Sequence, residues 1–172
     1  MARSVVVNVE GMSPYSPSKV LEAAERSGDM EPKGDKESHD DFEKRVWRYR
    51  IPHLKDGTCY IPSMAIKFMV DDTAKRLAMK KKGGGQATWT KHFVSGVMVT
   101  DNGVLHGNDW QKVPGQWFHL HANGKRGPGT RVWRCMAMIE PWTTTFEAIV
   151  MDDEIPSDLF ERVVAEAGRF MG

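Results

Sequence analysis

The feature that most constrains the fold of this chain is a strand-like segment, an acidic turn and an amphipathic helix, which follow one another over residues 145–171. Apolar and β-branched residues dominate 145–151, and residues 152–154 are all acidic. From Ser157 onward the apolar side chains recur near the helical period, which predicts a helix laid on a sheet. We therefore expect a compact sheet with helices on one face and, because no closing strand follows in the sequence, an open sheet edge.

Length and composition favour one domain. The chain has 172 residues, which is enough to bury a core without disulfide bonds. Its two cysteines, Cys59 and Cys135, fit neither a zinc-binding nor a redox spacing, so a reducing compartment is favoured. The apolar run at 5–7 is far too short for a signal peptide or a membrane span. We expect a single cytoplasmic domain over residues 1–172 with no membrane association.

The net charge of +1 hides two segregated runs of charge. Most charged residues at 29–43 are acidic, whereas 75–91 contain lysine and arginine without any acid. This segregation is compatible with a phosphate-binding side, and equally with ordinary solvated faces.

The first third of the chain predicts a strand, a short helix and an insertion. Apolar spacing indicates a strand at 4–10 and a short helix at 19–27. The polar segment 28–41 contains glycine and proline, and we expect it to be a mobile loop. A basic β-hairpin is predicted at about 42–61, with its first arm at 42–49.

The rest of the chain predicts a helix and further strands. A helix begins at Ser63, which is a plausible N-cap, and a strand is expected at 92–100. Two more strands, at 117–121 and 131–139, flank a basic glycine-rich loop. Without the inserted hairpin, this order predicts an α+β fold. We expect a ferredoxin-like or RRM-like antiparallel sheet with two helices on one face.

Histidines and acids give only weak signals for catalysis. His119 and His121 lie two residues apart on a predicted strand, so both rings face the same side and, with His92 or His106, could hold a metal. No carboxylate lies near that pair, and acids at 152–154 would stabilise a helix dipole without any chemistry. We expect no resident metal, cofactor or catalytic residue, and a metal-dependent phosphodiesterase is the third candidate function.

Two glycine-rich basic loops, at 80–85 and 124–131, are the stronger lead. Glycine lets backbone approach phosphate closely, lysine and arginine supply the countercharge, and nearby aromatic rings can stack on unpaired bases. Trp117 and Trp133 also lie near a basic loop, although a single tryptophan is more often a core residue. The predicted nucleic-acid-binding residues are Lys44, Arg45, Trp47, Arg48, Tyr49, Arg50, Lys80, Lys81, Lys82, Trp89, Lys125, Arg126 and Arg131.

Three segments resemble the RAMP superfamily, the repeat-associated proteins that form the backbone of CRISPR effector complexes. They are residues 60–67 (YIPSMAIK), 93–101 (FVSGVMVTD) and 166–172 (EAGRFMG), and their order is more specific than any one of them. The sequence is also similar in general style to small proteins of tailed phages and prophages. The resemblance implies an RRM-like fold that binds single-stranded nucleic acid.

These observations favour a non-enzymatic, phage-encoded protein that binds single-stranded RNA or DNA in the host cytoplasm. The leading alternative is an anti-CRISPR inhibitor that binds or imitates a CRISPR effector subunit. The acidic stretches 29–43 and 152–154, or the open sheet edge, would dock on such a partner. The edge would also allow self-association.

Overall fold

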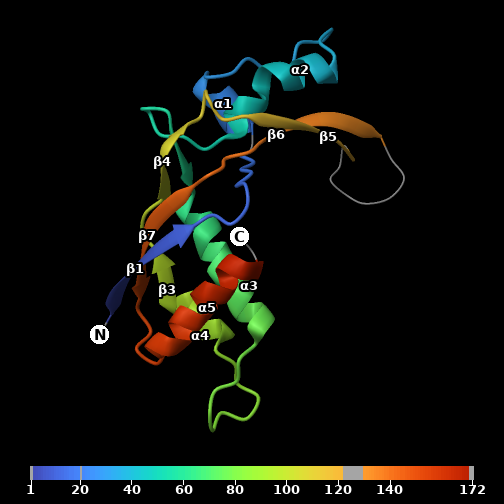
Figure 1. Ribbon diagram of the computed structural model, residues 1–172. Helices are drawn as coiled ribbons and strands as arrows, with labels where there is room; N and C mark the ends of the chain where they lie inside the picture. The colour runs from blue at the N-terminus through green and yellow to red at the C-terminus, as the bar shows by residue number, and fades with distance from the viewer. Residues whose placement is uncertain (1, 20, 122–129, 171–172) are drawn as a thin grey trace. The chain divides into compact units, whose positions relative to one another are not determined.

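The computed structural model describes residues 2–19, 21–121 and 130–170. Its helices and strands are, in chain order, β1 (Arg3–Glu10), α1 (Glu22–Ser27), α2 (His39–Val46), the 3₁₀ helix η1 (Trp47–Arg50), β2 (Thr58–Ile61), α3 (Ser63–Leu77), α4 (Thr90–Gly96), β3 (Val97–Val99), β4 (Gly103–Asp109), β5 (Gly115–His121), β6 (Arg131–Ala137), β7 (Thr143–Val150) and α5 (Ser157–Phe170). The fold is therefore α+β with antiparallel sheets, as the sequence predicts (Figure 1).

The chain forms two compact units, each assembled from separate stretches of sequence. Unit 1 contains Met1–Gly11, Tyr60–Leu105 and Thr143–Gly172, and unit 2 contains Met12–Cys59 and His106–Trp142. Strands β2 and β4 pair with each other, and each continues from one unit into the other.

Unit 1 is built on a three-stranded antiparallel sheet in the order β1-β7-β3. Arg3 lies opposite Val150 and Glu10 opposite Thr143, so β1 and β7 pair along their whole length. Exposure alternates along β1, and every second residue of β7 from Thr144 to Val150 is buried. The period of two sends one face of this sheet into the core.

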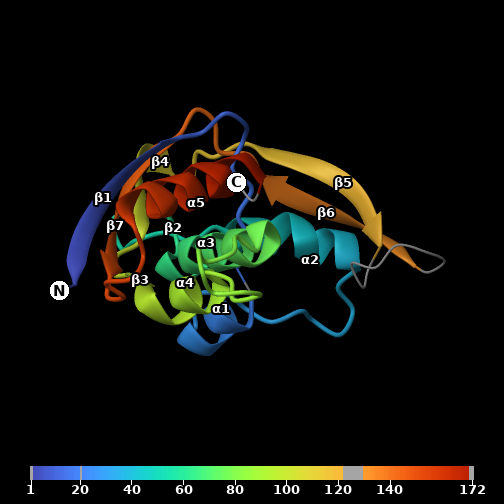
Figure 2. The same cartoon turned by 90° about the horizontal axis from the view of Figure 1, so that it is seen from below.

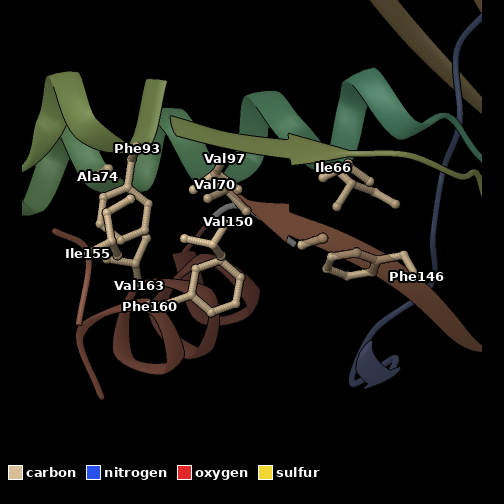
Figure 3. Close-up of a cluster of buried hydrophobic side chains, with 12 residues drawn as sticks. Ile66, Val70, Ala74, Phe93, Val97, Phe146, Val150, Ile155, Phe160 and Val163 are labelled. Carbon is tan, nitrogen blue, oxygen red and sulfur yellow. The ribbon is translucent and has the colours of Figure 1, made fainter. Parts of the chain in front are cut away.

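Helices α3 and α5 pack against each other, and their apolar faces join the buried face of the sheet (Figure 2). In α5, Phe160, Val163 and Ala167 are buried at helical spacing. The rings of Phe93 and Phe160 stack with centroids 6.4 Å apart in the middle of this core (Figure 3). The predicted helix on a sheet after residue 157 is confirmed.

Unit 2 combines short helices with the antiparallel β5–β6 hairpin. Gly115 pairs with Ala137 and His121 with Arg131, which confirms the two strands predicted around the basic loop. Helix α2 lies alongside β6, and Figures 1 and 2 both show it next to the hairpin. A small core of Ala24, Met30 and Val46 fills the space near α1 and α2.

Residues 42–49 do not form the first arm of an inserted hairpin, so that prediction is wrong. This segment is helical, in α2 and η1, and α2 begins inside the predicted loop. The side chain of Ser38 caps α2 by accepting a hydrogen bond from the Asp41 backbone N–H. Glu43 and Val46 are buried three residues apart, which is helical spacing.

Two further local predictions are corrected by the structure. Most of the strand expected at 92–100 is helix α4, and only Val97–Val99 is extended. Here His92, Phe93 and Gly96 are buried, a pattern that fits the helical period better than alternation. The N-cap of α3 is Pro62 rather than Ser63, whose backbone N–H instead donates to Asn102 Oδ1 at 2.9 Å. Within the described residues, no helix is long and apolar enough to span a bilayer.

Candidate nucleic-acid interface

Three arginines of the predicted site are held by the protein itself. Arg45 pairs with Glu37 at 2.9 Å and donates to the carbonyls of Glu31 and Pro32. Arg48 donates to the carbonyl oxygens of Trp110 and Val113 at 3.0 and 2.9 Å. These bonds fix loops of unit 2 and hold both guanidinium groups in place.

Arg50 forms a buried ion pair with Glu43. Its guanidinium donates to both carboxylate oxygens at 2.5 and 2.8 Å, and the Glu43 side chain has no exposed surface. Glu43 also accepts the backbone N–H of Cys135 at 3.2 Å, which ties α2 to β6. This buried ion pair of the predicted basic hairpin is therefore structural.

The aromatic residues predicted on that hairpin are also mainly structural. Arg48 lies over the ring of Trp47 at 4.3 Å, and Tyr49 packs on Trp110 with ring centroids 5.8 Å apart. Lys44 differs from these neighbours because it is exposed and pairs only loosely, at 3.2 Å, with the exposed Asp41. Of the residues predicted at 44–50, Lys44 is the one best placed to meet a ligand.

The lysine–glycine loop after α3 is anchored through one of its three lysines. Lys81 contacts Glu154, lies 4.7 Å from the centroid of the Trp89 ring and donates to His92 Nε2 at 3.3 Å. Lys80 and Lys82 are exposed. This loop therefore offers two lysines to a phosphate, while Lys81 and Trp89 hold it in place.

A hydrogen-bonded histidine and aspartate lie beneath this loop. His92 is buried and donates from Nδ1 to Asp152 Oδ2 at 2.6 Å. Two hydrogen bonds hold the pKa of Asp152 below its usual value of 3.8. The larger effect comes from His92, and the second from the Glu154 backbone N–H. Lys81 likewise lowers the pKa of Glu154. The acids at 152–154 are thus bound in part by the protein's own donors.

Two exposed tryptophans lie on the β5–β6 hairpin. Trp117 and Trp133 are 40% and 46% exposed, values unusual for side chains of their size. His119 pairs across the strands with Trp133, and their rings stack at 5.0 Å. A shallow groove of about 260 Å³ is lined by these two tryptophans together with Asp40 and Lys44 of α2. We call these lining residues and His119 the hairpin platform.

Arg131 is exposed at the start of β6, directly opposite His121. Lys125 and Arg126 of the predicted site lie outside the described residues. His119 stacks on tryptophan, and among the residues that the structure describes no three histidine, cysteine or acidic side chains gather as metal ligands. The hairpin therefore presents aromatic rings with cations nearby.

The two cysteines provide no reactive thiol in this region. Both are free and buried. Burial raises the pKa of Cys59 to about 11 and also raises that of Cys135. Neither is a thiolate at neutral pH, so neither is a nucleophile there.

Trp117 and Trp133 are not among the residues predicted from the sequence to bind nucleic acid. His119 is predicted there only as a possible metal ligand. The available signal was the period of two: residues 117, 119, 131 and 133 share one face once the two strands pair. The exposure of these side chains cannot be inferred from the sequence, because it depends on how far α2 covers the hairpin.

No protein-family model matches this chain, and no curated protein matches it.

Proposed function

We propose that this protein binds single-stranded RNA or DNA without catalysis, through the hairpin platform of unit 2. The observation that carries the proposal is the pair of exposed tryptophans, Trp117 and Trp133, in one groove with the exposed cation of Lys44. Stacking on aromatic side chains contributes about 1–3 kcal/mol per base in single-strand binding proteins.

Cations close to the platform support this proposal. Arg131 is exposed on the strand that carries Trp133. Lys125 and Arg126, which lie outside the described residues, belong to the proposal by their sequence alone. In unit 1, Lys80 and Lys82 supply a further basic surface on a glycine-rich loop. Lysine and arginine bind the phosphate backbone whatever the sequence of the strand.

For unit 1 we propose a ferredoxin-like, RRM-like architecture related to the RAMP superfamily. The order β1-β7-β3, with α3 and α5 on one face, supports it. A phage or prophage origin and a cytoplasmic setting belong to the same proposal.

Binding of labelled oligonucleotides to wild type and to Trp117→Ala, Trp133→Ala and Trp142→Ala variants, followed by fluorescence anisotropy, tests the function. We expect each platform variant to lose about tenfold in affinity, because one stacked base is lost. Trp142 is the matched control, because its indole N–H donates to the Ser13 carbonyl and its ring packs on Tyr15. Equal affinities for all three variants and wild type would contradict the platform, and no binding by wild type would contradict the function.

A second candidate, a protein-binding inhibitor of anti-CRISPR type, is favoured by strand β1. Within the described residues β1 pairs on one side only, with β7, and its eight residues contain neither proline nor lysine. Such an edge can pair with a strand of a CRISPR effector subunit or of a second copy. Pull-down from infected-cell lysate after nuclease treatment separates the candidates, since a partner that survives nuclease favours the inhibitor.

A further inference from the structure

A histidine, a lysine and two carboxylates of unit 1 are linked by hydrogen bonds, and we propose that His92 makes this cluster a pH-sensitive switch. His92 holds Lys81, and with it the lysine–glycine loop 80–85, only while its ring is neutral. In acid the ring gains a proton and releases Lys81, which then joins Lys80 and Lys82 as a third cation for phosphate. The phosphate step rests on the proposed function, whereas the release of the loop does not.

The hydrogen bonds of His92 fix which of its ring nitrogens carries the proton. Nδ1 lies 2.6 Å from Asp152 Oδ2, and an ionised carboxylate only accepts, so Nδ1 is the donor. Lys81 Nζ lies 3.3 Å from Nε2, and an ammonium group only donates, so Nε2 must offer a lone pair. One ring nitrogen donates and the other accepts, which is the arrangement of a neutral imidazole.

A second proton on this ring turns its contact with Lys81 from attraction into repulsion. Nε2–H and the ammonium group are then two donors and two positive charges that face each other at 3.3 Å. Of the two carboxylates, Asp152 already accepts from Nδ1 through Oδ2 and from the Glu154 backbone N–H through Oδ1. The carboxylate of Glu154, which accepts from Lys81, is left, so the protonated ring and the ammonium group compete for it.

Lys81 is the group that moves in this competition. The His92 side chain is 10% exposed and its ring is held by Asp152, whereas the side chains of Lys81 and Glu154 are 24% and 63% exposed. An ion pair with this much exposure is held weakly, because water screens it. The flexible lysine side chain can turn into solvent, and the buried ring cannot.

The two carboxylates keep their charge over the range in which histidine titrates, about pH 5–8. The bond from His92, and then the one from the Glu154 backbone N–H, lower the pKa of Asp152 below 3.8. The bond from Lys81 lowers the pKa of Glu154 below 4.5. A change of charge in this cluster between those pH values is therefore a change at His92.

The other charged groups around α4 face its backbone or solvent. Helix α3 and strand β3 pack against α4. On α3, Lys67 contacts Asp71 and donates to the carbonyl oxygens of α4 residues 93 and 94, both at 3.1 Å. Strand β3 carries no charged residue, and Lys91 on α4 and Asp153 in the turn before α5 are exposed. The charged partners of the His92 ring are thus those of the cluster itself.

Hydrogen–deuterium exchange at about pH 7.5 and 5.5 tests the release of the loop. The reporters are the backbone N–H groups of Lys81, Ala87 and Trp89, which donate to carbonyl oxygens in and beside the loop at 2.9, 3.0 and 2.9 Å. We expect their protection factors, corrected for the intrinsic pH dependence of exchange, to fall about tenfold in acid in wild type. The reason is that the loop opens more often once Lys81 no longer anchors it.

Two variants lock the switch in opposite states. His92→Gln cannot gain a proton, and its amide can donate to Asp152 and accept from Lys81, so we expect equal protection at both pH values. Lys81→Met removes the cation that is released, and it should show the low protection already at pH 7.5. His106→Gln is the matched control, because it removes an exposed histidine on β4 in unit 2 and should keep the wild-type response.

The salt dependence of binding to labelled oligouridine, followed by fluorescence anisotropy at the same two pH values, tests the phosphate step. One further phosphate contact steepens the slope of log affinity against log salt by about 0.7 for single strands. In acid, wild type and His106→Gln should be steeper by this amount than His92→Gln and Lys81→Met. At pH 7.5 we expect all four slopes to agree.

Equal protection of the loop at both pH values in wild type overturns the switch, and so does a fall in acid that persists in His92→Gln. Equal slopes for wild type and His92→Gln in acid overturn the assignment of Lys81 to phosphate. If wild type binds no oligouridine while its loop protection falls in acid and that of His92→Gln does not, the proposed function fails and the switch stands.

Discussion

At the scale of single residues, burial decides what each charged group does. Glu43 belongs to an acidic run that reads as solvated surface, yet its side chain has no exposed area. Arg50 and the Cys135 backbone N–H satisfy its carboxylate. Removing these partners would lower the stability of the fold, because they alone compensate the buried carboxylate for its lost hydration.

Replacing Glu43 with glutamine should therefore destabilise the protein by about 3–5 kcal/mol, since Arg50 keeps its charge in a largely buried place. Urea unfolding followed by circular dichroism measures this loss. Glu22→Gln makes the same chemical change at an exposed pair with Arg26, where we expect less than about 1 kcal/mol. Similar effects of the two substitutions would show that the Glu43 pair has little structural importance.

At the scale of elements, side-chain bonds connect segments that the sequence separates. His92 on α4 bonds to Asp152 in the turn between β7 and α5. A Cβ atom at Gly96 would come within 2.4 Å of the Asp152 side chain, so the two segments touch there. Only glycine at position 96 permits this approach, which brings His92 and Asp152 within bonding distance.

The lowered pKa of Asp152 predicts how stability depends on pH. Because its pKa in the folded state lies below 3.8, its contribution is present above that pH and is lost as pH falls through the lowered value. Asp152→Asn should be less stable than wild type at pH 7, and the two should converge in strong acid. Urea unfolding across this range measures the difference, with Asp35→Asn as the control. A difference that does not change with pH would contradict this account.

At the scale of the whole molecule, a net charge of +1 provides little long-range attraction for a polyanion. The proposed binding of nucleic acid therefore requires local groups of cations. Some of those expected from the sequence, such as Arg50 and Lys81, are occupied by internal partners. The exposed ones, such as Lys80 and Lys82, remain available.

Salt dependence measures how many of these cations touch phosphate. For single strands, each phosphate contact contributes about 0.7 to the slope of log affinity against log salt. Replacing Lys80 and Lys82 together with alanine should lower that slope by about 1.4. Lys75→Ala, which removes a lysine paired with Asp72, is the control in the same unit. An unchanged slope in the double variant would remove this loop from the interface.

The sequence by itself determined the elements whose apolar pattern is strong. Apolar residues recur with a period of two in β1 and β7 and with a period of 3.6 in α3 and α5. Each period identifies a buried face, because the apolar side chains of a strand or a helix reach the core only when they repeat with the period of that element. Where charged and aromatic residues interrupt the pattern, at 42–49 and 92–96, no local repeat reveals the helix. The Ser38 side chain caps α2, and burial of His92, Phe93 and Gly96 favours α4.

Tertiary structure alone decided which polar and aromatic residues are free to act. Lys44 and Arg45 are adjacent and both basic, yet one faces a groove and the other is held by Glu37 and two carbonyls. Trp117 and Trp133 look like core residues in the sequence, and they are exposed. The physical reason is that hydrophobic periodicity is written along the chain, whereas the partners that satisfy a charge or cover a ring come from distant segments.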